Sequence, residues 1–317
     1  MATTTLEELK KLDAGAWFSA RTAGTRLQSL AEVLSAAKNR VNLYLDCKSI
    51  DPDLLVREIR QARMESQVIV FAGLDVIAKI RSAAACLKSS SLAVGLAKKH
   101  GTRLHILHIS TADELGLFQN DRPLAQKRIT SEVCVHHLFF NSRHYPRLGN
   151  LIKCNPAIKS PAHQTALFPA LLDDRLDIIA TDHAPHTFAE KSQPYLQAPS
   201  GLPLVQHSLN LMLGFYWEGR ISLEKIVEKM CHAPAICFKI KERGFLDEGN
   251  WADLAVIDLE KRWKIAPENI LYKCGWSPLE GKTMRGHVES TIVSGHLAWH
   301  DGRFWVEKMG ERLLFDA

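Results

Sequence analysis

The chain has 317 residues, of which 46% are hydrophobic, and a formal net charge of +5. This is ample material for a globular core, and no apolar run approaches the roughly 20 residues that a membrane span needs. The basic residues are spread through helical stretches, so solvated helix surfaces explain them better than nucleic acid binding does.

The seven cysteines form no Cys-x-x-Cys pair, and several lie inside apolar stretches. That pattern favours buried thiols in a reducing compartment over a disulfide framework. The first five residues also lack the charged and then apolar build of a secretion signal. We therefore expect a cytoplasmic protein that acts on a small molecule, without nucleic acid or membrane partners; a monomer and a homo-oligomer are both left open.

Hydrophobic period and turn residues predict alternating helices and strands in the first part of the chain. Helices are expected over 6–12, 30–38 and 52–63, and strands over 41–46 and 68–71.

Four more strands are expected, each followed by or alternating with helical sequence, and they end near Ser110, His136, Asn155 and Asp182. About six strands would then be present where eight close a barrel. The predicted fold class is α/β, a (β/α) barrel of TIM type that is incomplete or open, or that another chain completes.

The C-terminal part changes character. Residues 249–258 and 290–299 alternate as short strands, with a tight turn at 300–302. We expect a small β-sandwich element there.

Three of the predicted strands end in residues that can bind a metal. The apolar run 176–180 leads to Asp182, the run after Arg103 leads to His105 and His108, and the run after Ile129 leads to His136 and His137. Imidazole and carboxylate groups hold Zn²⁺ while leaving a position for water, which suits metal-assisted hydrolysis.

Side chains on a strand alternate between its faces, so His105 and His108 cannot both point inward, nor can His136 and His137. His108 lies nearer the strand end and is the better candidate, whereas His105 is expected to pack against a helix. Periodicity does not choose between His136 and His137.

From Arg81 onward the chain resembles dihydroorotases of the amidohydrolase superfamily. The resemblance rests on five motifs in the same order and spacing, namely Ala85-Cys-Leu-Lys-Ser-Ser-Ser91, His105-Ile-Leu-His-Ile-Ser-Thr-Ala112, Glu132-Val-Cys-Val-His-His-Leu138, Asn155-Pro156 and Thr181-Asp-His-Ala-Pro-His186.

The resemblance implies a role for each matching residue. His108 and His136 would bind one or two zinc ions, and Asp182 would be both a ligand and the general base for the attacking water. Asn155 and His186 would contact the dihydroorotate ring, while the loop 199–203 closes near the substrate. It also favours His136 over His137.

Dihydroorotases begin their barrel with a His-x-His pair and an arginine that holds the substrate carboxylate. No His-x-His pair occurs in this sequence, whose first histidine is His100. This absence favours a second interpretation, a catalytically inactive dihydroorotase-like scaffold.

Residues 5–80 resemble the middle of a glycerophosphodiester phosphodiesterase, through segments such as Thr5-Leu-Glu-Glu-Leu-Lys-Lys-Leu-Asp13 and Leu43-Tyr-Leu-Asp-Cys-Lys48. That resemblance implies a metal ligand at Asp46 and a catalytic lysine at Lys48, and leaves phosphodiesterase activity as a third interpretation. We hypothesise that Asp46 or Lys48 supplies a surrogate ligand to the zinc site.

The two resemblances together suggest a chimera with three regions. Residues 1–80 would be a phosphodiesterase-like barrel fragment and 81–240 a dihydroorotase-like half barrel with the metal motifs. Residues 241–317 would form the C-terminal β-strand region.

Overall fold

The structure, a computed structural model, describes residues 29–38, 43–47, 52–63, 68–72, 74–305 and 310–316. The chain divides into two compact units, 1–81 and 82–317, and each is described by itself. The helix predicted over 6–12 lies outside the described residues.

The first unit contains two helix–strand repeats. Helix α2 (Leu30–Ala37) begins with a capping box, in which the Ser29 hydroxyl accepts from the Glu32 amide and the Glu32 carboxylate accepts from the Ser29 amide. Strands β1 (Leu43–Cys47) and β2 (Val68–Ala72) pair in parallel and flank helix α3 (Pro52–Ala62). These elements confirm the strands and helices predicted between residues 30 and 72.

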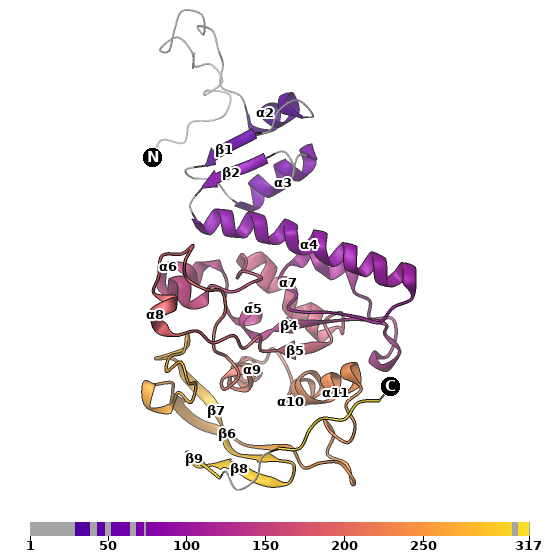
Figure 1. The fold of residues 1–317 in the computed structure, drawn as a ribbon, viewed down its shortest axis with the longest axis vertical. Coiled ribbons are helices and arrows are strands. Elements are labelled where there is room, and N and C mark those ends of the chain that lie inside the picture. Colours follow the sequence, from indigo (N-terminus) through magenta and orange to yellow (C-terminus); the bar gives the residue numbers. More distant parts are fainter. Residues whose placement is uncertain are drawn as a thin grey trace, which may run out of the picture. The chain divides into compact units, whose positions relative to one another are not determined.

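A parallel three-stranded sheet forms the centre of the second unit (Figure 1). Helix α4 (Leu74–His100) leads to strand β3 (Leu104–Ile106), which pairs with β4 (Ile129–Cys134), and β4 pairs with β5 (Ile178–Ala180). Because the strands are parallel, the residues that follow them meet at one edge of the sheet.

The two faces of this sheet differ. Val133 and Ile179 are register partners that belong to the main hydrophobic core with Leu171 of helix α7 (Pro161–Leu172). The alternate positions, Glu132 and Cys134, therefore point to the opposite face. Polar and thiol groups are thus presented on the face that does not pack against α7.

The remaining helices connect the strands or follow them. They are η2 (Ala112–Leu117), η3 (Leu124–Gln126), α5 (Val135–Phe139), η4 (Ser142–His144), α6 (Tyr145–Leu148), η5 (Gly149–Ile152), α8 (Phe188–Lys191), α9 (Ser208–Trp217), α10 (Leu223–Val227), the π-helix η6 (Glu228–His232), α11 (Ala233–Phe238) and η7 (Pro267–Asn269). None of the described helices is long and apolar enough to cross a membrane.

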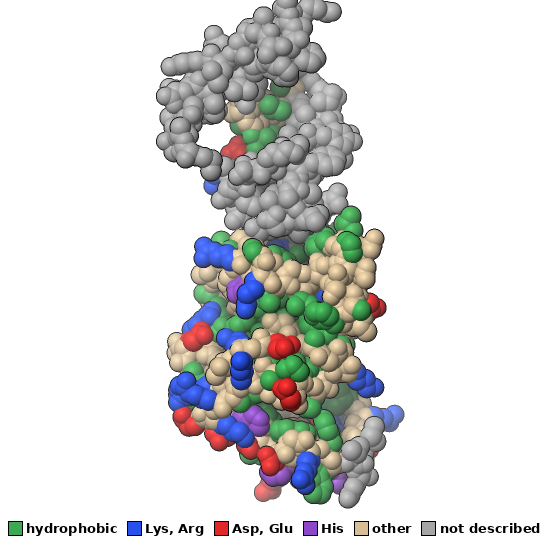
Figure 2. Space-filling model, turned by 90° about the vertical axis from the view of Figure 1, so that its left-hand side faces the viewer, with side chains coloured by type: hydrophobic (Ala, Val, Ile, Leu, Met, Phe, Trp, Pro, Cys, Tyr) green, Lys and Arg blue, Asp and Glu red, His purple; other side chains and the backbone are tan. Residues whose placement is uncertain are grey.

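The chain ends in an antiparallel sheet of the order β6-β7-β8-β9. Its strands are β6 (Leu254–Lys264), β7 (Thr283–Val293), β8 (His296–His300) and β9 (Arg303–Phe304). On the face shown in Figure 2, acidic and basic side chains are intermingled over the described surface, with hydrophobic side chains exposed between them.

Two predicted strands are wrong. No strand ends at Asn155: the 3₁₀ turn η5 precedes it, because Gly149 and Pro156 interrupt the apolar run. The single strand expected over 290–299 is two strands, since the chain turns at Ser294 and Gly295, both with positive φ. The tight turn at Asp301 and Gly302 is confirmed.

The described strands do not join into one sheet, so the barrel and the C-terminal sandwich remain predictions. The α/β character itself is confirmed, with parallel strands separated by helices in both units.

Candidate metal centre

Two predicted ligands lie on strained backbone just after parallel strands. His108 follows β3 with φ 43°, and Asp182 follows β5 with φ 45°. For a residue with a β-carbon, the left-handed conformation costs about 1–2 kcal/mol of conformational free energy. Strain of this kind persists where the surrounding structure fixes it, and it is concentrated at functional sites.

His136 is fully buried in the first turn of helix α5. Neither of its ring nitrogens has a hydrogen-bond partner of normal geometry among the described residues. Burial, and secondly the charge of His108, lower the pKa of His136 to about 3, while the Thr181 backbone acts in the opposite direction. The imidazole is therefore neutral near pH 7, with a lone pair free for a metal.

His108, His136 and Asp182 each follow one of the three neighbouring strands β3, β4 and β5. Burial raises the pKa of Asp182, the charge of His108 lowers it and that of Glu132 raises it again. His108 thus acts electrostatically on both His136 and Asp182. The three residues share one edge of the β3-β4-β5 sheet.

The strand-alternation argument is wrong for His136 and His137. Strand β4 ends at Cys134 and helix α5 begins at the next residue, so both histidines lie on a helical turn and both are buried. Their ring centroids are 4.2 Å apart. His137 Nε2 lies 3.1 Å from the Pro156 carbonyl oxygen.

Glu132 was not among the predicted site residues. Its carboxylate is buried on β4, where Oε1 accepts from the His108 amide at 3.4 Å and Oε2 lies 3.1 Å from His105 Nε2. His105 packs edge-to-face against Phe238 of α11, so its predicted contact with a helix is present.

The two predicted substrate residues lie in segments that approach Asp182 or the loop after it. Asn155 is exposed, and its neighbour Cys154 is buried close enough for Asp182 to act on the pKa of its thiol. His186 Nε2 lies 3.1 Å from the Ser200 carbonyl oxygen, within the loop 199–203.

A buried lysine holds this loop. Lys191 is 1% exposed, and its ammonium donates to the carbonyl oxygens of Lys153, Pro199 and Gly201 at 3.0, 3.0 and 2.7 Å. Burial lowers the pKa of Lys191 to about 8. Lys191 therefore ties the segment before Asn155 to the loop that contacts His186.

The structure does not place the residues predicted from the phosphodiesterase resemblance. Asp46 lies on β1, whose side chains are outside the description, and Lys48 is outside the described residues.

The donor set fits a divalent transition metal. A neutral, buried imidazole without a partner, a second histidine and a carboxylate are ligands that zinc accepts. An unpartnered buried imidazole is otherwise costly, and a bound ion would satisfy it.

Comparison with known proteins identifies the class. Residues 75–298 match the Amidohydrolase family, and the chain therefore belongs to that family. Among curated proteins it is similar to the dihydroorotase of Methanothermobacter thermautotrophicus, with 35% identity over 209 residues, which is 66% of this chain and 47% of that protein. The dihydroorotase of Bacillus caldolyticus is 38% identical over 209 residues, which is 66% of this chain and 48% of that protein. The chain spans about half the length of the curated relatives that it matches.

Solved structures agree on the fold. L-hydantoinase (dihydropyrimidinase) from Arthrobacter aurescens has a TM-score of 0.64 at 23% identity, covering 87% of this chain and 68% of that one. D-hydantoinase from a Thermus species has a TM-score of 0.64 at 17% identity, covering 90% and 69%. These findings support the amidohydrolase part of the sequence prediction; the phosphodiesterase resemblance and the chimera gain no support from them.

Proposed function

We propose that the chain is a metal-dependent cyclic amide hydrolase of the dihydroorotase type, which interconverts dihydroorotate and carbamoyl aspartate. The observation that carries the proposal is that His108, His136 and Asp182 follow three neighbouring parallel strands at one edge of the sheet, with His108 near enough to affect the pKa of the other two residues. The dihydroorotases among its relatives support the substrate class.

In this proposal His108, His136 and Asp182 hold the metal, with zinc as the ion expected. When bound, the ion would supply Lewis acidity toward the amide carbonyl and lower the pKa of water. Asp182 accepts the proton of the attacking water and returns it to the leaving ring nitrogen. Asn155 and His186 orient the ring, and Lys191 keeps the loop beside His186 in place.

The test is hydrolysis of dihydroorotate by the purified full chain with and without added Zn²⁺. We expect turnover that depends on zinc and falls at least 100-fold in Asp182→Asn, because the proton acceptor is lost. Asp247→Asn, a change at an exposed carboxylate, is the matched control and should retain activity. A wild-type chain that binds zinc without turning over dihydroorotate would overturn the proposal.

An inactive dihydroorotase-like scaffold is the second candidate, favoured by the missing His-x-His pair. It predicts no turnover at any zinc concentration and equal activity of wild type and Asp182→Asn. The phosphodiesterase alternative depends on Asp46 and Lys48 alone. We also propose that the chain divides into regions at residues 80 and 240. A further part of the proposal is that Asp46 or Lys48 supplies a surrogate metal ligand. If the amount of bound metal is unchanged after both residues are mutated, neither residue is a ligand.

A further inference from the structure

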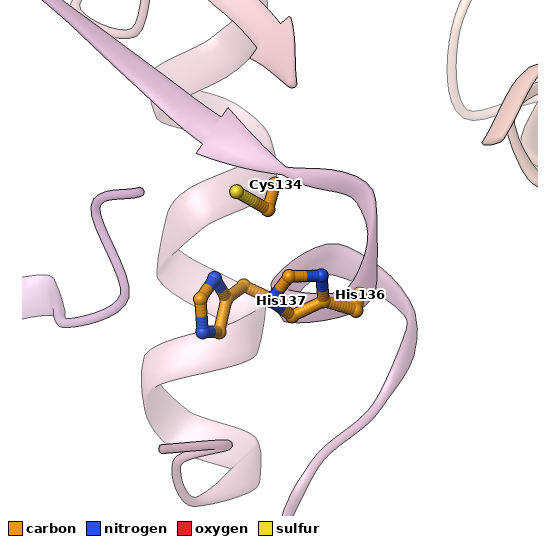
Figure 3. Close-up of side chains that lie close together, drawn as sticks. All are labelled: Cys134, His136 and His137. Atoms are coloured by element: carbon orange, nitrogen blue, oxygen red, sulfur yellow. The ribbon is translucent and has the colours of Figure 1, made fainter. Parts of the chain in front are cut away.

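Three potential ligands converge where β4 passes into α5. One ligand atom each of Cys134, His136 and His137 lies within 4.8 Å of the others, and all three residues are buried. Figure 3 shows these side chains close together at the end of the strand. The convergence arises because the helix begins directly after Cys134, which brings residues two and three positions later back toward its sulfur.

The hydrogen bonds leave lone pairs available in this group. The Pro156 carbonyl can only accept, so His137 Nε2 carries the proton of that hydrogen bond and Nδ1 carries the lone pair. His137 Nδ1 and both nitrogens of His136 lack partners among the described residues. A metal-ligating histidine commonly donates its other N–H to a backbone carbonyl in this way.

We propose that Cys134, His136 and His137 form a site for a thiophilic divalent metal ion, Zn²⁺ or Cd²⁺, which shares His136 with the set of His108, His136 and Asp182. One thiolate and two imidazoles select soft or borderline ions. Zinc binds sulfur at about 2.3 Å and nitrogen at about 2.0 Å. The three ligand atoms, which lie within 4.8 Å of one another, therefore need to move closer together by roughly 1 Å to share one ion. The Cys134 S–H bond breaks, a sulfur–metal bond forms, and the proton leaves to solvent.

This site goes beyond the proposed function and does not depend on it. His136 belongs to both sets, so an ion held by Cys134 and His137 withdraws His136 from the pair of His108 and Asp182. The two sets therefore compete for one imidazole. Soft ions should favour the cysteine set, whereas the carboxylate of Asp182 favours harder ions.

The experiment uses the full chain, freed of metal and titrated with Cd²⁺ and separately with Co²⁺. We expect a thiolate-to-metal charge-transfer band that saturates near one equivalent and disappears in Cys134→Ser. His137→Gln should weaken ion binding at least tenfold, whereas Asp182→Asn and His108→Gln should retain the band. Cys154→Ser, a change at another buried cysteine, is the matched control and should retain it as well.

Absence of the band in the wild-type chain, which needs no variant to fold, would overturn the inference. Persistence of the band in a Cys134→Ser protein with native circular dichroism would do the same, because another cysteine would then be the ligand. Dihydroorotate turnover is measured separately, on zinc-loaded Cys134→Ser, in which the cysteine set cannot withdraw His136. A band in the wild-type chain with no turnover by zinc-loaded Cys134→Ser would keep this site and lose the proposed function, and turnover without the band would do the reverse.

Discussion

Glu132 and His108 are joined by a hydrogen bond in which the carboxylate accepts from the strained His108 amide at 3.4 Å. The other carboxylate oxygen is engaged by His105. Glu132 therefore holds the left-handed residue that follows the neighbouring strand β3, and we expect it to position His108 in the proposed metal centre.

Glu132→Ala should lower zinc affinity by about 10- to 100-fold, the usual effect of losing a group that orients a ligand. Glu132→Gln keeps an oxygen that can accept from the His108 amide, so its loss should be smaller. Competition with a chromophoric chelator measures both. Equal affinities of Glu132→Ala and wild type would show that His108 is held by other contacts.

Gly201 has φ 131°, and a β-carbon there would lie 2.5 Å from the Ala184 carbonyl oxygen. Gly201→Ala should therefore lower the free energy of unfolding by about 2 kcal/mol or more and displace the loop from His186. Gly116→Ala is the matched control, because a β-carbon at Gly116 meets no described atom within 4 Å. Chemical denaturation of the two variants makes the comparison, and similar stabilities would contradict the assigned close contact.

Lys191→Met keeps much of the side-chain volume and removes the ammonium. The carbonyl oxygens of Pro199 and Gly201 then lose a buried donor, which costs about 1–3 kcal/mol for each unsatisfied group. We expect faster proteolysis and faster amide hydrogen exchange in residues 195–203. Lys98→Met, at an exposed helix position, serves as the control and should leave both rates unchanged.

His207 is fully buried beside Tyr272, whose hydroxyl lies 3.0 Å from His207 Nδ1. Burial lowers the pKa of His207 from 6.5 to about 4. Between these values the unfolded chain binds a proton that the folded chain does not, so stability is lost as pH falls from 6.5 toward 4 and regained as pH rises. His207 should account for about 2 kcal/mol of stability lost between pH 7 and pH 5.

The measurement for His207 is urea unfolding of wild type and His207→Gln at pH 7 and pH 5. His136 also has a lowered pKa and is unchanged in the variant, so the variant should lose less stability than wild type, but still some. If the two proteins lose the same amount, His207 does not remain neutral in the folded state.

The sequence predicted the elements whose signals are local. Apolar runs predicted strands β1 to β5, and His108 and Asp182 lie just after β3 and β5, as the sequence indicated. Alternation failed at His136 and His137, because it assumes that a strand continues and here a helix begins after Cys134.

Interactions between distant residues left no sequence signal. Glu132 is 24 residues from His108, and Lys191 is 38 residues from Lys153, so neither partnership follows from period or spacing. The clash that requires glycine at position 201 likewise depends on how the loop packs against Ala184.

The left-handed backbone at His108 and Asp182 has a cost in stability. Glycine adopts this conformation without the cost that a β-carbon imposes. Glycine at position 108 or 182 would therefore relieve the local backbone strain and at the same time remove the imidazole or the carboxylate.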